Sequence, residues 1–189
     1  ICGSYISNKF GNIHEKPMIK ALENYGHQVK SLKILKNTEK YNYLERKLAI
    51  KYHLGRCAKE INKNFVNYIK EENPDCIFLY NCPWIFLRSL KIVRDSCKNI
   101  MVYCNDDPFS KKKFLYNRNI RDSYKIADII YSYRPKNILD ISKSYKKFSK
   151  LLLPSFDKEN FKEFSDFNKL EINFPNRIYD VCFIGHYEK

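Results

Sequence analysis

Apolar and polar residues along this chain follow two periods, and the periods predict an ordered series of strands and helices. Short apolar runs bounded by turn-forming residues predict strands at residues 1–6, 29–35, 75–80, 100–104, 128–133, 150–154 and 179–186. Apolar residues spaced by three and four predict helices at about 13–25, 43–72, 84–97, 114–127 and 135–145. Gly55 is expected to kink or divide the longest of these helices.

The strand at residues 75–80 shows what kind of sheet these elements build. Residues 76–80 are apolar without a break, which indicates a strand buried on both faces, as in a parallel sheet. Strands that alternate with helices predict an α/β fold. We therefore expect a doubly wound, Rossmann-like parallel sheet with helices on both faces.

The pattern changes after residue 154. A stretch that carries several phenylalanines precedes a fresh strand at 179–186. We expect residues 1–176 to form one Rossmann-like domain with a linker at its end, and residues 177–189 to hold the first strand of a second domain. Both ends of the chain are expected to be cut, because it starts at Ile1 within a strand and stops at Lys189 soon after one.

Composition narrows the class of protein. The chain is 44% hydrophobic and 15% aromatic, as a globular domain is. No apolar run approaches the ~20 residues of a membrane-spanning helix, and no signal-peptide pattern is present. The seven cysteines lack the paired spacing of a zinc site, and their odd number indicates a reducing compartment. We expect a cytoplasmic protein without a bound metal.

The formal net charge of +14 favours acidic partners, such as nucleic acid, anionic lipid or a phosphorylated small molecule. A plainer source is also open. The lysines are scattered along the predicted helices, as on solvated faces, and the excess of Lys, Asn, Ile and Tyr is typical of AT-rich coding. Charge alone allows peripheral contact with an anionic membrane and does not predict specific nucleic-acid binding.

The main candidate site follows the strand at 100–104. Asn105, Asp106 and Asp107 form an acidic loop that Pro108 and Phe109 close, and Asn105, Pro108 and Phe109 are candidates for substrate binding. Ligands of open α/β sheets bind where the strands end, so these carboxylates are candidates for catalysis. If both faced inward, their repulsion would raise one pKa, as suits a general base. The local alternative is a turn in which an aspartate binds backbone N–H groups.

Two further strand ends carry candidates for substrate binding. Asn81 and Trp84 follow the strand at 75–80; Trp84 could pack beneath the loop or form a platform for a sugar or base. Gly11, Asn12 and His14 lie in the first loop, where a helix N-terminus would offer N–H groups to an anion. The alternative for His14 is a solvated residue at the helix start.

Several segments, in this order, resemble the N-terminal half of a GT-B glycosyltransferase, in particular the spore-maturation (CgeB-like) group. The segments are the opening loop and helix end at 11–29, the "P-D-hydrophobic" strand at 74–79, the "DDP" segment at 103–110 and the "DV-x-F-x-G" strand at 179–185. The spacing of these motifs covers almost the whole chain, and the Asp-Asp-Pro loop is the most specific of them.

The resemblance implies a transferase that moves a sugar from a nucleotide-sugar co-substrate to a glycan, lipid or protein acceptor, with no metal or other cofactor. In this group the donor is held mainly by the C-terminal domain. The chain would then supply the acceptor side of the cleft and would be inactive alone. Asp106 or Asp107 would be the base, and Gly185 and His186, at the end of the last strand, would approach the substrate.

Another class of function remains open. A non-catalytic α/β module could bind a nucleotide or polyanion through basic residues at 111–113 and 143–150. A receiver domain with a magnesium-binding acidic pair is disfavoured, because that pair follows the first strand in receivers and a later strand here.

Overall fold

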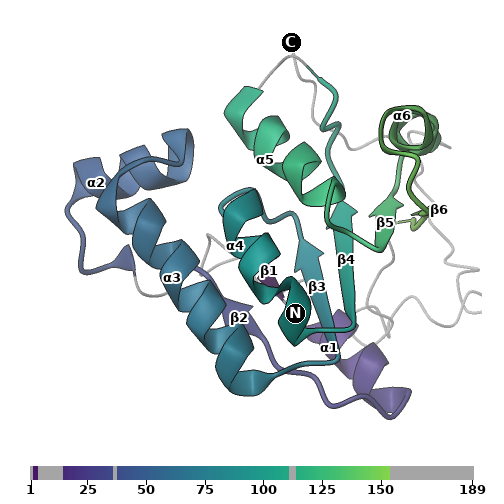
Figure 1. Cartoon of the computed structure of the whole chain (residues 1–189), viewed down its shortest axis with the longest axis horizontal. Helices are drawn as coiled ribbons and strands as arrows, with labels where there is room; N and C mark the ends of the chain where they lie inside the picture. The colour runs from purple at the N-terminus through teal and green to yellow at the C-terminus, as the bar shows by residue number, and fades with distance from the viewer. Residues whose placement is uncertain (1, 4–14, 36–37, 111–113, 154–189) are drawn as a thin grey trace, which may run out of the picture. The chain divides into compact units, whose positions relative to one another are not determined.

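A computed structural model of the chain describes residues 2–3, 15–35, 38–110 and 114–153 (Figure 1). These residues all belong to one compact unit, residues 1–155. The predicted linker, the strand at 179–186 and the domain boundary at 176–177 lie outside the described residues.

Six parallel strands form one sheet in the order β2-β1-β3-β4-β5-β6. This confirms the predicted parallel α/β sheet. The edge strand β2 is much shorter than the predicted run at 29–35, because only two of its residues pair with β1. The strands are β1 (Cys2–Gly3), β2 (Leu32–Lys33), β3 (Cys76–Tyr80), β4 (Asn99–Cys104), β5 (Ile129–Ser132) and β6 (Ser149–Leu151).

Helices connect successive strands, and the direction of the connections fixes their places. The chain steps from β1 outward to β2, then crosses back to β3 and continues the other way to β6. Right-handed crossovers, which are the rule in parallel sheets, predict α1 on the opposite face of the sheet from the helices that follow. The helices are α1 (Glu15–Asn24), α2 (Tyr43–Lys47), the π-helix η2 (Leu48–Tyr52), α3 (Gly55–Glu72), α4 (Leu87–Val93), the 3-10 helix η3 (Arg94–Ser96), α5 (Phe114–Tyr124) and α6 (Pro135–Tyr145).

The predicted long helix at 43–72 is divided, as the glycine indicated. His53 ends η2 with a φ of 57°, and Gly55 starts α3 with a φ of 88°. Left-handed backbone breaks the helical hydrogen-bond series, and glycine adopts it without steric cost. The result is two separate helical segments, 43–52 and 55–72.

The helix predicted to begin at Trp84 begins later, at Leu87. The reason is Asn62 of α3, which is buried and makes four hydrogen bonds. Its side-chain oxygen accepts from the Phe86 N–H at 2.8 Å and from the Ser89 hydroxyl at 2.8 Å. Its amide donates to the Trp84 carbonyl at 2.9 Å, so Trp84 and Phe86 are held in the loop before the helix.

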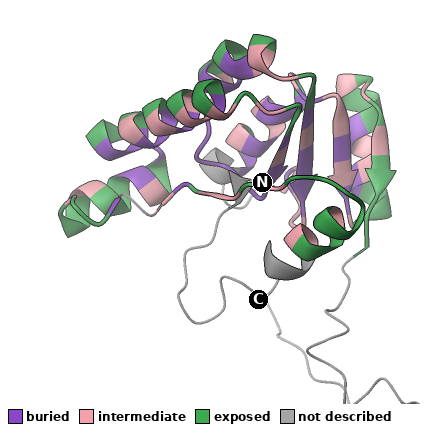
Figure 2. Cartoon of the chain, turned by 90° about the horizontal axis from the view of Figure 1, so that it is seen from below, coloured by how far each residue is buried: buried purple, intermediate pink, exposed green. Residues whose placement is uncertain are grey.

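The core lies between the sheet and its helices, where Figure 2 shows buried strands beneath helices with exposed outer faces. Leu79 of β3, Ile100 of β4 and Ile130 of β5 are fully buried, together with Phe65 of α3. Each such side chain contributes about 1.5–3 kcal/mol of hydrophobic free energy. No helix in the described ranges has the length and apolar character needed to cross a membrane.

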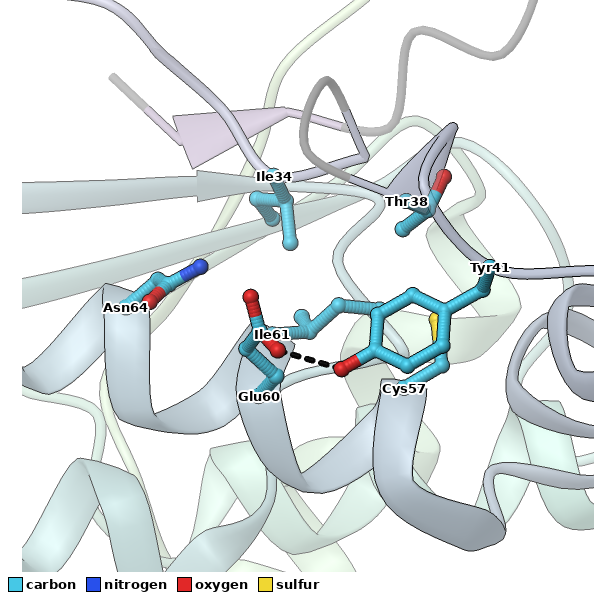
Figure 3. A pocket seen from close by; sticks show the side chains of 7 residues that line it. All are labelled: Ile34, Thr38, Tyr41, Cys57, Glu60, Ile61 and Asn64. Carbon is cyan, nitrogen blue, oxygen red and sulfur yellow. Dashed lines mark hydrogen bonds between the residues drawn. The ribbon is translucent and has the colours of Figure 1, made fainter.

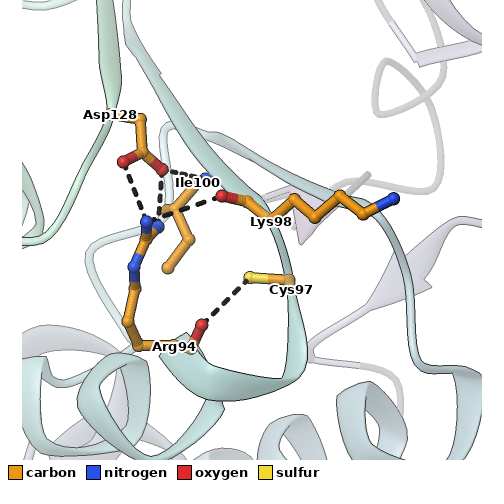
Figure 4. A network of polar contacts seen from close by, with 5 residues as sticks. All are labelled: Arg94, Cys97, Lys98, Ile100 and Asp128. Atoms are coloured by element: carbon orange, nitrogen blue, oxygen red, sulfur yellow. Dashed lines mark hydrogen bonds and ion pairs between the residues drawn. The ribbon is translucent and has the colours of Figure 1, made fainter.

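The amino ends of β4 and β5 are joined by one ionic network (Figure 4). The Arg94 guanidinium donates to both carboxylate oxygens of Asp128, at 2.5 and 2.9 Å. Asp128 also accepts from the Ile100 N–H at 2.8 Å. Burial opposes the charge on Asp128, yet the hydrogen bonds from Arg94 and Ile100 hold the pKa of its carboxyl below the ordinary value.

Replacing Asp128 by Asn should lower the free energy of unfolding by about 1–2 kcal/mol, discounted for partial exposure. Because the folded-state pKa is lowered, this contribution is present above pH ~4, the ordinary carboxyl pKa, and is lost as the pH falls through the lowered value. Urea unfolding at several pH values would measure both effects. Asp95→Asn, an exposed aspartate in the adjacent η3, is the matched control; an equal loss in the control would contradict the assignment.

Candidate functional site

The carboxyl ends of β3 and β4 meet at a pair of amides. Asn81 follows β3 with a φ of 44°, and its N–H donates to the Tyr103 carbonyl oxygen at 2.9 Å. The Asn105 N–H donates to the Asn81 side-chain oxygen at 3.0 Å, and the Asn81 amide donates to the Asn105 side-chain oxygen. These reciprocal bonds bring together two residues that the sequence predicted at separate strand ends.

Two tyrosines flank the amide pair. The rings of Tyr80 and Tyr103 lie 5.1 Å apart, and the Asn105 amide reaches the Tyr80 hydroxyl at 3.5 Å. Burial raises the pKa of Tyr103 to about 12. Burial, and then the nearby Cys104 and Asp106, raise the pKa of Tyr80. Both phenols therefore stay protonated at neutral pH, and Asp106 lies close enough to influence one of them.

The two aspartates of the loop have different roles. One side-chain oxygen of Asp107 accepts from the Phe109 N–H at 3.0 Å, and the Asp107 carbonyl accepts from the Ser110 N–H at 3.2 Å. Asp107 thus forms the local turn that was the alternative to catalysis. The Asp106 carboxylate, by contrast, makes no hydrogen bond or ion pair with the residues that the structure describes.

Helix α5, which follows the acidic loop, binds two carbonyl groups of that loop. The Asn117 amide donates to the Ser110 carbonyl at 2.8 Å, and the Arg121 guanidinium donates to the Pro108 carbonyl. The two donors are one helical turn apart, so they lie on the same face of α5. Sequence reasoning missed both. A polar pair at this spacing just after the loop was the available signal.

The start of α6 contributes a cation and a buried amide. Arg134 donates to the Tyr133 hydroxyl at 2.6 Å. This hydrogen bond raises the pKa of the Arg134 guanidinium, although burial acts in the opposite direction. The nearby Asp107 and Asp106 raise the same pKa further. The fully buried Asn137 donates to the Asp106 carbonyl at 3.2 Å. Its side-chain oxygen has no hydrogen-bond partner in the described part of the chain. Both were missed, although Arg134 directly follows a strand end.

Trp84 packs beneath the loop, which was the alternative to a platform for a sugar or base. Its side chain is 5% exposed and belongs to the hydrophobic core. The indole N–H donates to the Ile50 carbonyl of η2 at 3.2 Å. The ring therefore holds the π-helix against the loop that carries Asn81.

His53 joins the same loop to α5. The Asn119 amide donates to the Pro83 carbonyl at 2.8 Å and contacts the His53 imidazole Nδ1. Burial lowers the pKa of His53 below its ordinary value, although a hydrogen bond with the Ile50 backbone acts in the opposite direction. His53 is thus a neutral structural side chain at neutral pH.

The remaining predicted residues fall into two groups. Pro108 is buried and Phe109 half-buried in the acidic loop, as placed by the sequence. The substrate-binding candidates Gly11, Asn12, His14, Gly185 and His186 lie outside the described residues.

A hollow between the turn at 38–41 and α3 is lined by none of the predicted site residues (Figure 3). It is too tight for a water molecule, and within it the Tyr41 hydroxyl donates to Glu60. That bond is the main reason why the pKa of Tyr41 rises to about 12. Lys40 pairs with the same carboxylate, so this contact is structural.

Among the described residues, no group of three or more His, Cys, Asp and Glu side chains is arranged to hold a metal ion. No family model, curated protein or solved structure matches the chain. The fold and site above therefore rest on the chain's own residues.

The amide pair should stabilise the strand ends. We expect Asn81→Ala and Asn105→Ala each to lower the free energy of unfolding by about 1–3 kcal/mol, because each leaves a partly buried amide unpaired. The double variant should lose less than the sum, with a coupling of about 0.5–3 kcal/mol. Denaturant unfolding of the three variants measures this, and additive losses would show that the amides act independently.

His53 should make stability depend on pH in a separate range. Because its folded-state pKa is lowered, protonation favours the unfolded chain, and stability should fall as the pH drops below about 6.5. His53→Asn, which tolerates the left-handed backbone, should lose this slope. Thermal unfolding between neutral and mildly acidic pH checks it. An unchanged slope in the variant would assign the titration to another group.

Proposed function

We propose that this chain is the acceptor-side domain of a GT-B-type glycosyltransferase and that Asp106 is its general base. The observation that carries the proposal is the division of labour in the acidic loop. The Asp107 carboxylate binds the turn, whereas the adjacent Asp106 carboxylate has no partner among the described residues. Asp106 lies at the carboxyl edge of a parallel sheet, where open α/β folds bind ligands.

The surroundings of Asp106 suit a polyhydroxyl acceptor. The amides of Asn81 and Asn105 and the protonated phenol of Tyr80 provide donors and acceptors on one side. Such a mixture of neutral polar groups and one carboxylate can orient a sugar hydroxyl and accept its proton.

The reaction follows from these roles. Asp106 takes the proton from the acceptor hydroxyl as its oxygen attacks the anomeric carbon of the donor sugar. A new carbon–oxygen bond forms, and the bond to the nucleotide diphosphate breaks. The resemblance to the GT-B class implies that a second domain holds the nucleotide. Arg134, close to the acidic loop, adds positive charge on this side.

Substitutions at the two aspartates test the proposal in a complete protein that carries this domain. Asp106→Asn should lower kcat for nucleotide-sugar turnover by about 10²–10⁴-fold, because a neutral amide cannot accept the proton. Asp107→Asn keeps an oxygen for the Phe109 N–H and should retain most activity. Asp107→Ala should lower the free energy of unfolding by about 1 kcal/mol. Steady-state kinetics and thermal unfolding give both readouts.

Two outcomes would overturn the assignment. If Asp106→Asn keeps full turnover in an active enzyme, this residue is not the base. If the protein shows no turnover but binds oligonucleotides with a steep salt dependence, the chain is a polyanion-binding module.

A further inference from the structure

An unusual number of large apolar side chains are exposed in α2 and η2 and at Leu54, which follows them. This segment lies at the margin of the domain, beside the amino end of α3 (Figure 1). A soluble surface carries exposed leucines singly, whereas a cluster of them marks an interaction site. The exposed fractions are 72% for Tyr43, 68% for Leu44, 44% for Leu48, 41% for Tyr52 and 61% for Leu54.

These side chains follow the helix in two neighbouring stripes. Leu44, Leu48 and Tyr52 are spaced by four and form the apolar stripe. The adjoining stripe is basic. Lys47 lies 5.7 Å from the ring of Tyr43, and Lys51 lies 5.4 Å from the ring of Tyr52. The ammonium groups thus stand directly beside the aromatic rings at the edge of the apolar stripe.

The opposite side of the segment is fixed to the domain. Ala49 is fully buried, and the Ile50 carbonyl accepts the indole N–H of Trp84. At the other end, the Arg56 guanidinium of α3 pairs with Glu45 at 2.7 Å. The leucine stripe therefore cannot turn inward without breaking these contacts.

Further positive charge lies beside the segment. Arg56, Lys59 and Lys63 of α3 line an open surface hollow together with one acidic residue, Glu60, which pairs with Lys40. Among residues 43–56, four side chains are basic and only Glu45 is acidic. The apolar stripe is thus bordered by cations on the same part of the surface.

We propose that α2 and η2 form a docking surface for an anionic lipid bilayer. Apolar side chains on one face, tyrosines at its edge and lysines beside them match the layers of a membrane interface: acyl chains, the headgroup region and anionic headgroups. A protein partner would be met by an apolar centre with few charges, whereas here lysines form the row next to the leucines and lie against the tyrosine rings. The surface would place the domain at a membrane independently of its proposed catalytic role.

Flotation of the 189-residue chain with phospholipid vesicles at physiological salt tests the proposal. The chain should float with vesicles of phosphatidylcholine and phosphatidylglycerol and remain unbound with phosphatidylcholine alone. Lys47→Gln with Lys51→Gln should reduce the apparent affinity by about ten-fold or more. Leu44→Ser with Leu48→Ser should reduce it by at least a similar factor, about ten-fold.

Matched controls use exposed residues elsewhere. Leu139→Ser, at a leucine that is 60% exposed on α6, and Lys91→Gln, at an exposed lysine of α4, should leave flotation unchanged. The proposal is overturned if the unmodified chain does not float with the anionic vesicles. It is also overturned if the leucine variants bind as the unmodified chain does, since the contact is then electrostatic only. Concentration-dependent dimers that the leucine substitutions abolish, without vesicle binding, would instead assign the surface to a second copy.

Discussion

The reciprocal hydrogen bonds between Asn81 and Asn105 set the geometry on which the rest of the candidate site depends. They tie the ends of two adjacent parallel strands, and they do so after each strand has left the sheet. The left-handed backbone of Asn81 turns the end of β3 toward the end of β4. As a result, the acidic loop starts from a fixed point, and Asp106 follows immediately. A general base must be held in a fixed position relative to its substrate, and the amide pair fixes the start of the loop that carries the proposed base.

The loop beyond Asp106 is held by α5 and α6 rather than by the sheet. Asn117 and Arg121 bind its carbonyl groups from one helix, and Asn137 binds the carbonyl of Asp106 from the other. Every one of these bonds goes to backbone. The loop is thus fixed without use of the Asp106 carboxylate, which is the group that we propose as the base. This arrangement is the physical basis for treating the two adjacent aspartates as different.

Periodicity predicted the parallel sheet and its helices because apolar runs and helical spacings are local properties of the chain. The division of the long helix at Gly55 was also predicted, since a single glycine indicates it. The start of α4 was predicted wrongly, because the side chain of Asn62 holds Trp84 and Phe86 in the loop before the helix, and Asn62 is too distant in sequence for a local pattern to show this. The prediction of a parallel sheet put Asn81 and Asn105 at strand ends on the same edge, but their mutual pairing could not be predicted from either segment alone. The same reason explains why Arg134, Asn137 and the α5 donors were missed. They reach the loop only through the tertiary fold.

Chemical rescue is the most direct test of the claim that Asp106 acts as the base. In the complete protein, Asp106→Ala should be nearly inactive, and added formate should restore nucleotide-sugar turnover, because a small carboxylate can occupy the vacated position and accept the proton. Asp107→Ala should gain nothing from formate. Rescue of both variants alike, or no rescue of Asp106→Ala in a folded protein, would contradict the account.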